Sequence, residues 1–135
     1  MNSNYSIAEL TIKLIFKEDG LNNLSLLPSF SPFEIAEPSK EDNLFELTID
    51  DKTAPIAKSE RVRIKTIDTG NGNIIVDQTN DGRHQFIIKD INGNSCCLLI
   101  ANKEFSVCQC ALNGNYDMRS FGLNNAIMIA YAFAS

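Results

Sequence analysis

Several features by which proteins are commonly classified are scarce in this sequence. It contains no tryptophan and one histidine, and its longest uninterrupted apolar run, 126–134, is nine residues long. A helix that crosses a bilayer needs about 20 apolar residues, so we expect no membrane span. The N-terminus has neither the basic stretch nor the apolar core of a secretory signal. These absences favour a cytoplasmic protein.

Basic charge is also scarce. Twelve Lys and Arg against 17 Asp and Glu give a formal net charge of −5. Proteins that bind nucleic acid or anionic membranes need an excess of basic charge near the phosphates, so we expect neither as a partner. The length of 135 residues and a hydrophobic content of 44% are typical of one globular domain. We therefore expect a single β-rich domain over 1–135.

Residue combinations typical of catalysis or metal binding are missing. No Gly-Lys pair occurs, which excludes a Walker loop. His84 has no partner at catalytic or ligand spacing. The cysteines at 96, 97, 108 and 110 are too close together for a secreted disulfide framework, and we interpret them as small buried hydrophobic residues. We expect no catalytic residue, no metal and no cofactor in this chain, and no enzymatic activity.

Turn motifs recur at a regular interval. Asn-Gly-Asn occurs at 71–73, 92–94 and 113–115, with a spacing of 21 residues between successive glycines, which suggests a repeated unit. Within the first unit, Asp81-Gly82 lies between two apolar runs, and this is a strong β-hairpin signal. The pattern predicts an antiparallel meander from 72 to 110.

The turns also predict a register. If each turn has two residues, Ile75 lies opposite Ile88, Ile87 opposite Leu98, and Leu98 opposite Val107. Both faces of the sheet are then apolar near its centre, and both should be covered.

Alternating polar and apolar residues indicate further strands between residues 7 and 65. Between them, Pro28, Pro32 and Pro38 predict an ordered connector with Phe30 and Phe33 as apolar anchors. Altogether we expect a mostly β fold with a C-terminal helix, of the β or α+β class. About seven or eight short strands should form an antiparallel sandwich or a partly open barrel.

The helix is expected over 122–134, where the sequence is alanine-rich and apolar on nearly all sides. The segment has neither a glycine cap nor a basic last turn. We expect it to connect to a downstream domain missing from this chain, or to mediate a homo-oligomer. The candidate interface consists of its larger apolar residues: Leu123, Ile127, Met128, Tyr131 and Phe133.

A second candidate surface is basic. Arg61, Arg63 and Lys65 alternate with Val62 and Ile64, which predicts that the three cations share one face of a strand. Such a face could hold a small anion or an acidic partner. A solvated outer sheet face is the simpler interpretation.

Two stretches resemble a known family. They are Leu-Leu-Pro-Ser-Phe-Ser-Pro-Phe at 26–33 and the segment from Phe121 to Ala134, which contains Gly-Leu-Asn-Asn. Both are similar to Bacteroidetes proteins that resemble HPr serine kinase and phosphoenolpyruvate carboxykinase. In that family a β-rich N-terminal region precedes a P-loop kinase-like domain. The likeness implies that this chain is the N-terminal region alone, and no nucleotide-binding residue can be assigned to it.

Two functions follow as hypotheses. The resemblance and the apolar helix favour a non-catalytic accessory, regulatory or substrate-presenting domain that docks onto a kinase-like domain. The alternative is a self-contained small barrel or sandwich that binds a small ligand or a protein partner, with a lumen formed by the face that carries Phe86, Ile88 and Leu99.

Overall fold

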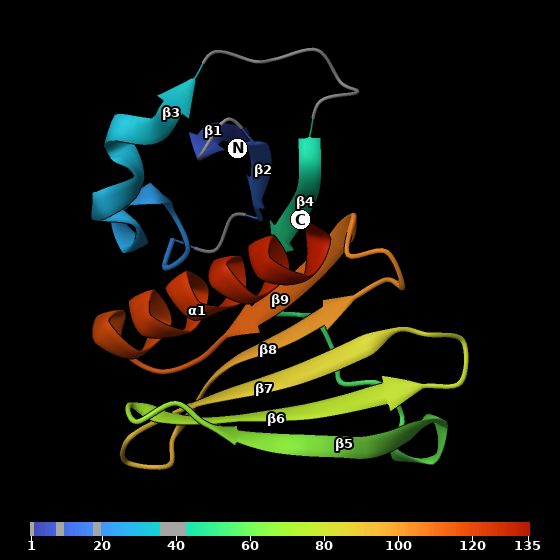
Figure 1. Ribbon diagram of the computed structural model, residues 1–135. Helices are drawn as coiled ribbons and strands as arrows, with labels where there is room; N and C mark the ends of the chain where they lie inside the picture. The colour runs from blue at the N-terminus through green and yellow to red at the C-terminus, as the bar shows by residue number, and fades with distance from the viewer. Residues whose placement is uncertain (1, 8–9, 18–19, 36–42) are drawn as a thin grey trace.

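The computed structural model describes residues 2–7, 10–17, 20–35 and 43–135 (Figure 1). Its strands form one open sheet in the order β3-β1-β2-β4-β9-β8-β7-β6-β5, and α1 lies across one face. The elements are β1 (Asn2–Ile7), β2 (Leu10–Phe16), the 3₁₀ helices η1 (Leu24–Leu26) and η2 (Pro28–Phe33), β3 (Glu34–Ile35), β4 (Asn43–Ile49), the 3₁₀ helix η3 (Lys58–Glu60), β5 (Arg61–Asp68), β6 (Gly72–Thr79), β7 (His84–Asp90), β8 (Ser95–Ala101), β9 (Val107–Leu112) and α1 (Tyr116–Ala134).

The prediction of a mostly β chain with a C-terminal helix is confirmed, but the sandwich or barrel is replaced by this single sheet. The reason is that β4 pairs in parallel with both β2 and β9. These two pairings join the β1–β2 hairpin edge to edge with the strands from β5 to β9 in one sheet. The second layer is therefore formed by α1 and not by a second sheet. The sheet has nine strands because it includes β1 and the two-residue β3, whose sequences show little alternation.

The predicted antiparallel meander is confirmed from β6 to β9, and β5 extends it by one more antiparallel strand. The register across Asn92-Gly93 is confirmed, since Ile87 lies opposite Leu98. The other two registers are wrong: Ile88 lies opposite Ile74, and Leu98 opposite Ala111. Both turns are longer than two residues. In the second, Asn102 Oδ1 accepts from the N–H groups of Ser106 and Val107, which stabilises a wide turn.

Helix α1 begins six residues before the predicted start at 122. Asn115 caps it, with Oδ1 accepting from the N–H of Met118 at 3.0 Å. Three small buried residues, Gly122, Ala126 and Ala130, recur every fourth position. A Cβ atom at Gly122 would lie 2.8 Å from the Cys96 carbonyl oxygen. The small residues therefore allow α1 to pack close to β8. No helix in the described ranges is long and apolar enough to span a membrane.

The core lies between α1 and the sheet. Leu123 and Ile127 of the helix belong to the same buried cluster as Phe86, Ile88 and Leu99 of the strands. The face expected to form a ligand lumen is therefore filled by α1. All four cysteines are buried free thiols, which confirms their interpretation as small core residues. Burial raises the pKa of the Cys108 thiol to about 12, and a hydrogen bond with Cys97 together with burial raises that of Cys110.

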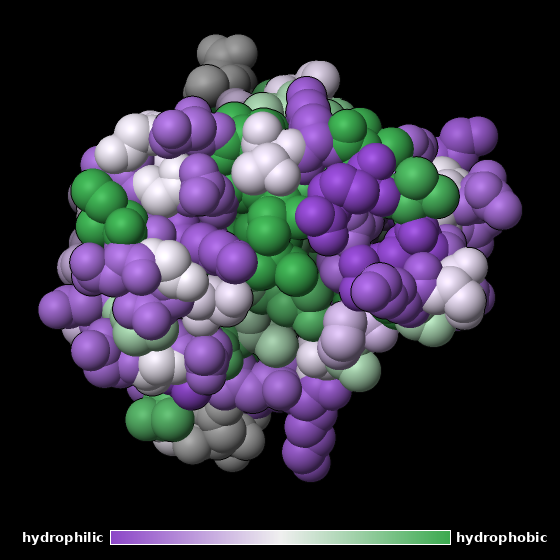
Figure 2. Space-filling view, turned by 90° about the horizontal axis from the view of Figure 1, so that it is seen from below, coloured by the Kyte–Doolittle hydropathy of each residue, from purple (hydrophilic) through white to green (hydrophobic). Residues whose placement is uncertain are grey.

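The opposite face of the sheet is covered only in part. Residues 50–60 pass behind the sheet (Figure 1), and Ile56 is buried there, with its N–H donating to Gln85 Oε1 at 2.8 Å. Beside this segment, Ile75, Ile87 and Leu98 form a half-buried row across three strands. From below, apolar side chains appear between polar ones (Figure 2). The expectation that both faces are covered thus holds fully only on the α1 side.

Candidate functional site

The predicted interface residues of α1 do not share one surface. Leu123 and Ile127 are buried in the core, whereas the Met128 side chain is 66% exposed. Phe133 is exposed on one side, but its ring stacks on Phe105 with 4.8 Å between centroids. Tyr131 is half-buried, and its hydroxyl donates to the Ile7 carbonyl oxygen at 2.9 Å. Of these residues, Met128 and Tyr131 lie together at a surface open to a partner, and Phe133 is exposed apart from them.

That surface contains a pocket of about 420 Å³, which we call the α1 pocket. Helix α1 contributes its side from Ile127 to Tyr131, and η2 and the end of β1 form the opposite wall. The lining residues are Ile7, Ser29, Phe30, Phe33, Ile127, Met128 and Tyr131. Two of these residues have polar side chains. The Tyr131 hydroxyl already donates to the Ile7 carbonyl oxygen, so the Ser29 hydroxyl is the polar group that the lining offers to a ligand. The pocket therefore fits an uncharged apolar group.

Polar contacts at both ends position the walls of the α1 pocket. On the helix, Tyr116 donates to the Ser25 carbonyl oxygen and Ser120 Oγ donates to that of Leu26 at 2.7 Å. Farther along the same side, Tyr131 binds Ile7. The Phe30 ring packs edge-on against Tyr5, with 5.6 Å between centroids. The prediction of an ordered connector is borne out for the described residues up to 35, with Phe30 as an anchor packed against the core. Phe33 is exposed and is not such an anchor.

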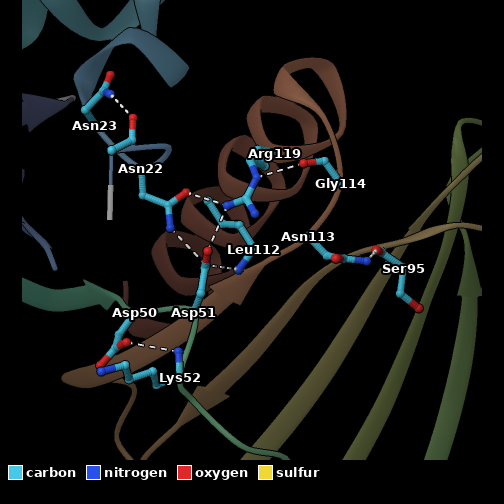
Figure 3. A network of polar contacts seen from close by, with 11 residues as sticks. Asn22, Asn23, Asp50, Asp51, Lys52, Ser95, Leu112, Asn113, Gly114 and Arg119 are labelled. Carbon is cyan, nitrogen blue, oxygen red and sulfur yellow. Dashed lines mark hydrogen bonds and ion pairs between the residues drawn. The ribbon is translucent and has the colours of Figure 1, made fainter. Parts of the chain in front are cut away.

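A buried polar network fixes the first turns of α1 (Figure 3). The Arg119 guanidinium binds Asp51 Oδ2 and Asn22 Oδ1, each at 2.9 Å, and its Nε donates to the Gly114 carbonyl oxygen at 2.8 Å. Asp51 Oδ1 in turn accepts from the Leu112 N–H and the Asn22 amide. The network joins three segments that are far apart in sequence. Sequence reasoning missed it, because nothing near Arg119 marks the residue as buried or paired.

The basic residues of β5 are divided between the two faces of the sheet. Arg63 lies opposite Asp77, but a bulge follows, and Lys65 lies opposite Val76. Since adjacent residues on β6 point to opposite faces, Lys65 faces away from the two arginines. Arg61 and Arg63 both bind Asp77, whose side chain is buried. The three residues thus form no shared anion site: two of them neutralise a buried carboxylate.

His84 belongs to an aromatic cluster. Its ring lies 5.0 Å from Phe105 and 6.3 Å from Phe133, measured between centroids, and it stacks on Phe86 at 6.1 Å. Burial lowers the pKa of His84, against a smaller opposing contribution from the Gly82 backbone. Nδ1 is buried and has no hydrogen-bond partner among the described residues. These surroundings favour a neutral packing residue.

Within the described ranges, no three His, Cys, Asp or Glu side chains are grouped so that they could hold a metal ion. The buried thiols have pKa values raised above the ordinary value at Cys96, Cys108 and Cys110, and a protonated thiol is a poor nucleophile and a poor metal ligand. The α1 pocket is the arrangement best suited to binding.

The chain matches no protein-family model, no curated protein and no solved structure.

Proposed function

We propose that this chain is a non-catalytic accessory domain that docks onto another protein domain through the α1 pocket. The observation that carries the proposal is the pocket itself, which is open, almost wholly apolar and flanked by the exposed Met128. Exposed apolar surface of this kind is typical of interaction sites. Methionine adapts its flexible side chain to a partner's shape.

The resemblance at 26–33 and 121–134 supplies the expected partner, a P-loop kinase-like domain encoded downstream. Both stretches contribute to the α1 pocket: Phe30 and Phe33 come from the first, and Ile127, Met128 and Tyr131 from the second. The two segments that carry the resemblance therefore meet at the proposed docking surface. The proposed role is regulatory or substrate-presenting.

The first test is to read the natural reading frame past codon 135. A strand pattern followed by Gly-x-x-x-x-Gly-Lys supports the kinase-like partner, and its absence refutes that partner. The second test compares hydrogen exchange in this chain alone and continued through the downstream domain. Docking should slow exchange in η2 and in residues 124–134, with no change at the far end of the sheet.

A matched pair of variants tests the surface. Met128→Glu should abolish the protection, because it places a charge beside the apolar pocket. Ile91→Glu makes the same kind of change at an exposed residue in the turn between β7 and β8, and it should have no effect. Equal protection in both variants would exclude the α1 pocket as the docking surface. If the chain alone forms a dimer that Met128→Glu dissociates, the occupant is a second copy.

A small ligand is the second candidate occupant. The volume of about 420 Å³ lies within the range of roughly 300–1,000 Å³ typical of small-molecule sites. The lining favours an uncharged aromatic or aliphatic molecule. A ligand that copurifies with the chain and is lost in Met128→Glu, without any docking by a downstream domain, would favour this alternative.

A further inference from the structure

Strand β5 forms one edge of the sheet, far from the α1 pocket. It pairs with β6 on one side, and none of the described residues pairs with its other side. Every residue after Arg61 is exposed, and the exposed residues include Val62, Ile64 and Ile67. An edge strand presents unpaired N–H and C=O groups that can bind a further strand. The eight residues of β5 thus provide a long unpaired edge, which the two-residue β3 at the other end of the sheet does not.

The charge of this edge is opposite to that of the whole protein. Strand β5 contains three basic residues, all within 61–65, and one acidic residue, Asp68, whereas the chain carries a net charge of −5. Asp77 offsets one of these cations. Arg63 uses Nε for that contact, and its side chain is 54% exposed, so its terminal Nη groups remain accessible. Lys65 is exposed and makes no ion pair with any described residue.

A second copy of the chain cannot pair symmetrically along residues 61–65 of this edge without placing like charges opposite each other. In a symmetric antiparallel pair the two-fold axis passes between directly opposite residues, because hydrogen-bonded and non-hydrogen-bonded pairs alternate. Centring the axis on Ile64 places Arg63 opposite Lys65 of the other copy, and centring it on Arg63 or Lys65 places that cation opposite itself. Centring it on Val62 places Arg61 opposite Arg63. Like charges directly opposite each other destabilise a strand pair.

We propose that β5 accepts an extended acidic segment of a partner protein as a tenth strand. The backbone of the edge supplies the hydrogen bonds, and the side chains select for charge. Because the bulge after Arg63 turns Lys65 to the other face, the segment needs one carboxylate on each face, which two consecutive acidic residues provide. β-Branched residues on either side of this acidic pair contact Val62 and Ile67. The same cations that oppose self-pairing along 61–65 thus admit an acidic strand.

The test uses the peptide acetyl-Thr-Val-Glu-Glu-Val-Thr-amide and the ¹⁵N-labelled chain. We expect amide shifts confined to β5 and its neighbours on β6, together with slower hydrogen exchange along 61–68. Affinity should fall as salt is raised to 0.5 M, because exposed charges are screened. The peptide with Lys-Lys in place of Glu-Glu should not bind.

A matched pair of charge reversals completes the test. Lys65→Glu should weaken binding by at least about threefold, and Lys103→Glu, at an exposed turn residue on the other side of the meander, should leave it unchanged. Both residues are exposed, so both variants should fold. Shifts located elsewhere, equal binding of the Lys-Lys peptide, or unchanged affinity in Lys65→Glu would overturn the proposal. So would a peptide-free dimer with protected β5 amides. None of these outcomes depends on whether the α1 pocket docks a domain.

Discussion

Replacing Arg119 by methionine should destabilise the protein far more than the same replacement of an exposed arginine. Its side chain is 10% exposed and that of Asp51 is 27% exposed. Methionine retains most of the apolar stem but removes the guanidinium, and with it the contacts to Asp51, Asn22 and Gly114. The Gly114 carbonyl and the Asp51 carboxylate each lose a charged donor.

The magnitude follows from this geometry. Removing one partner of a buried ion pair costs about 3–5 kcal/mol. Asp51 is partly exposed and still accepts from Leu112 and Asn22, so the cost should lie at or below the lower end of that range. We expect Arg119→Met to lower the free energy of unfolding by about 2–3 kcal/mol. With a urea dependence of about 1.5 kcal/mol per molar, the unfolding midpoint should fall by about 1.3–2 M.

Arg83 provides the matched control. It also pairs with an aspartate, Asp81, but the two side chains are 41% and 66% exposed. Arg83→Met should change the free energy of unfolding by less than about 0.5 kcal/mol. A double-mutant cycle of Arg119→Met with Asp51→Asn should give a coupling of at least about 1 kcal/mol. Equal midpoint shifts for the two arginine variants would refute the reasoning.

Three further predictions concern the core. Gly122→Ala should destabilise the fold by about 1–3 kcal/mol, although alanine is the better helix former, because its Cβ would meet the Cys96 carbonyl; a higher urea midpoint would contradict this. The pKa of His84 is lowered in the folded protein, so below pH 6.5, the ordinary pKa of histidine, the unfolded chain binds more protons than the folded one. Stability should therefore fall as the pH drops below 6.5. Urea midpoints between pH 5.5 and 7.5 should show this slope, and His84→Leu should remove it. With the pKa of Cys108 at about 12 and all four thiols buried, iodoacetamide at pH 8 should leave the folded protein unmodified and alkylate it in urea; rapid reaction of any thiol in the folded state would contradict the buried core.

The sequence predicted what depends on local pattern. The meander from β6 to β9 follows from alternating residues and turn residues. The register at Asn92-Gly93 is correct because a register shift between Ile88 and Lys89 offsets the extra length of that turn. The turns at 79–83 and 102–106 also have more than two residues. At 102–106 the hydrogen bonds of the Asn102 side chain stabilise this wider turn. Turn residues indicate that a chain reverses, whereas the number of residues in the turn depends on contacts that the pattern does not contain.

Long-range pairing was beyond the sequence. Nothing in the residues of β4 indicates that it pairs in parallel with both β2 and β9, and without that information a sandwich was the natural expectation. The residues of the candidate interface are divided between core and surface for a related reason. Leu123 and Met128 are both large apolar residues in one apolar helix, yet one is buried and the other exposed, and only the position of the sheet distinguishes them. The bulge that separates Arg63 from Lys65 is likewise invisible to a count of alternating residues.

The α1 pocket and the Arg119 network are coupled through the same segment of the chain. Arg119 binds Asn22, and Tyr116 and Ser120 bind the carbonyls of Ser25 and Leu26, immediately before the helix η2 that forms one wall of the pocket. On the other side, Tyr131 is tied to Ile7. Polar contacts at both ends of the pocket therefore fix the position of its walls relative to α1. Loss of Arg119 should loosen the wall formed by η2 before the sheet unfolds, so hydrogen exchange in residues 24–33 of Arg119→Met should accelerate more than exchange in β7 and β8.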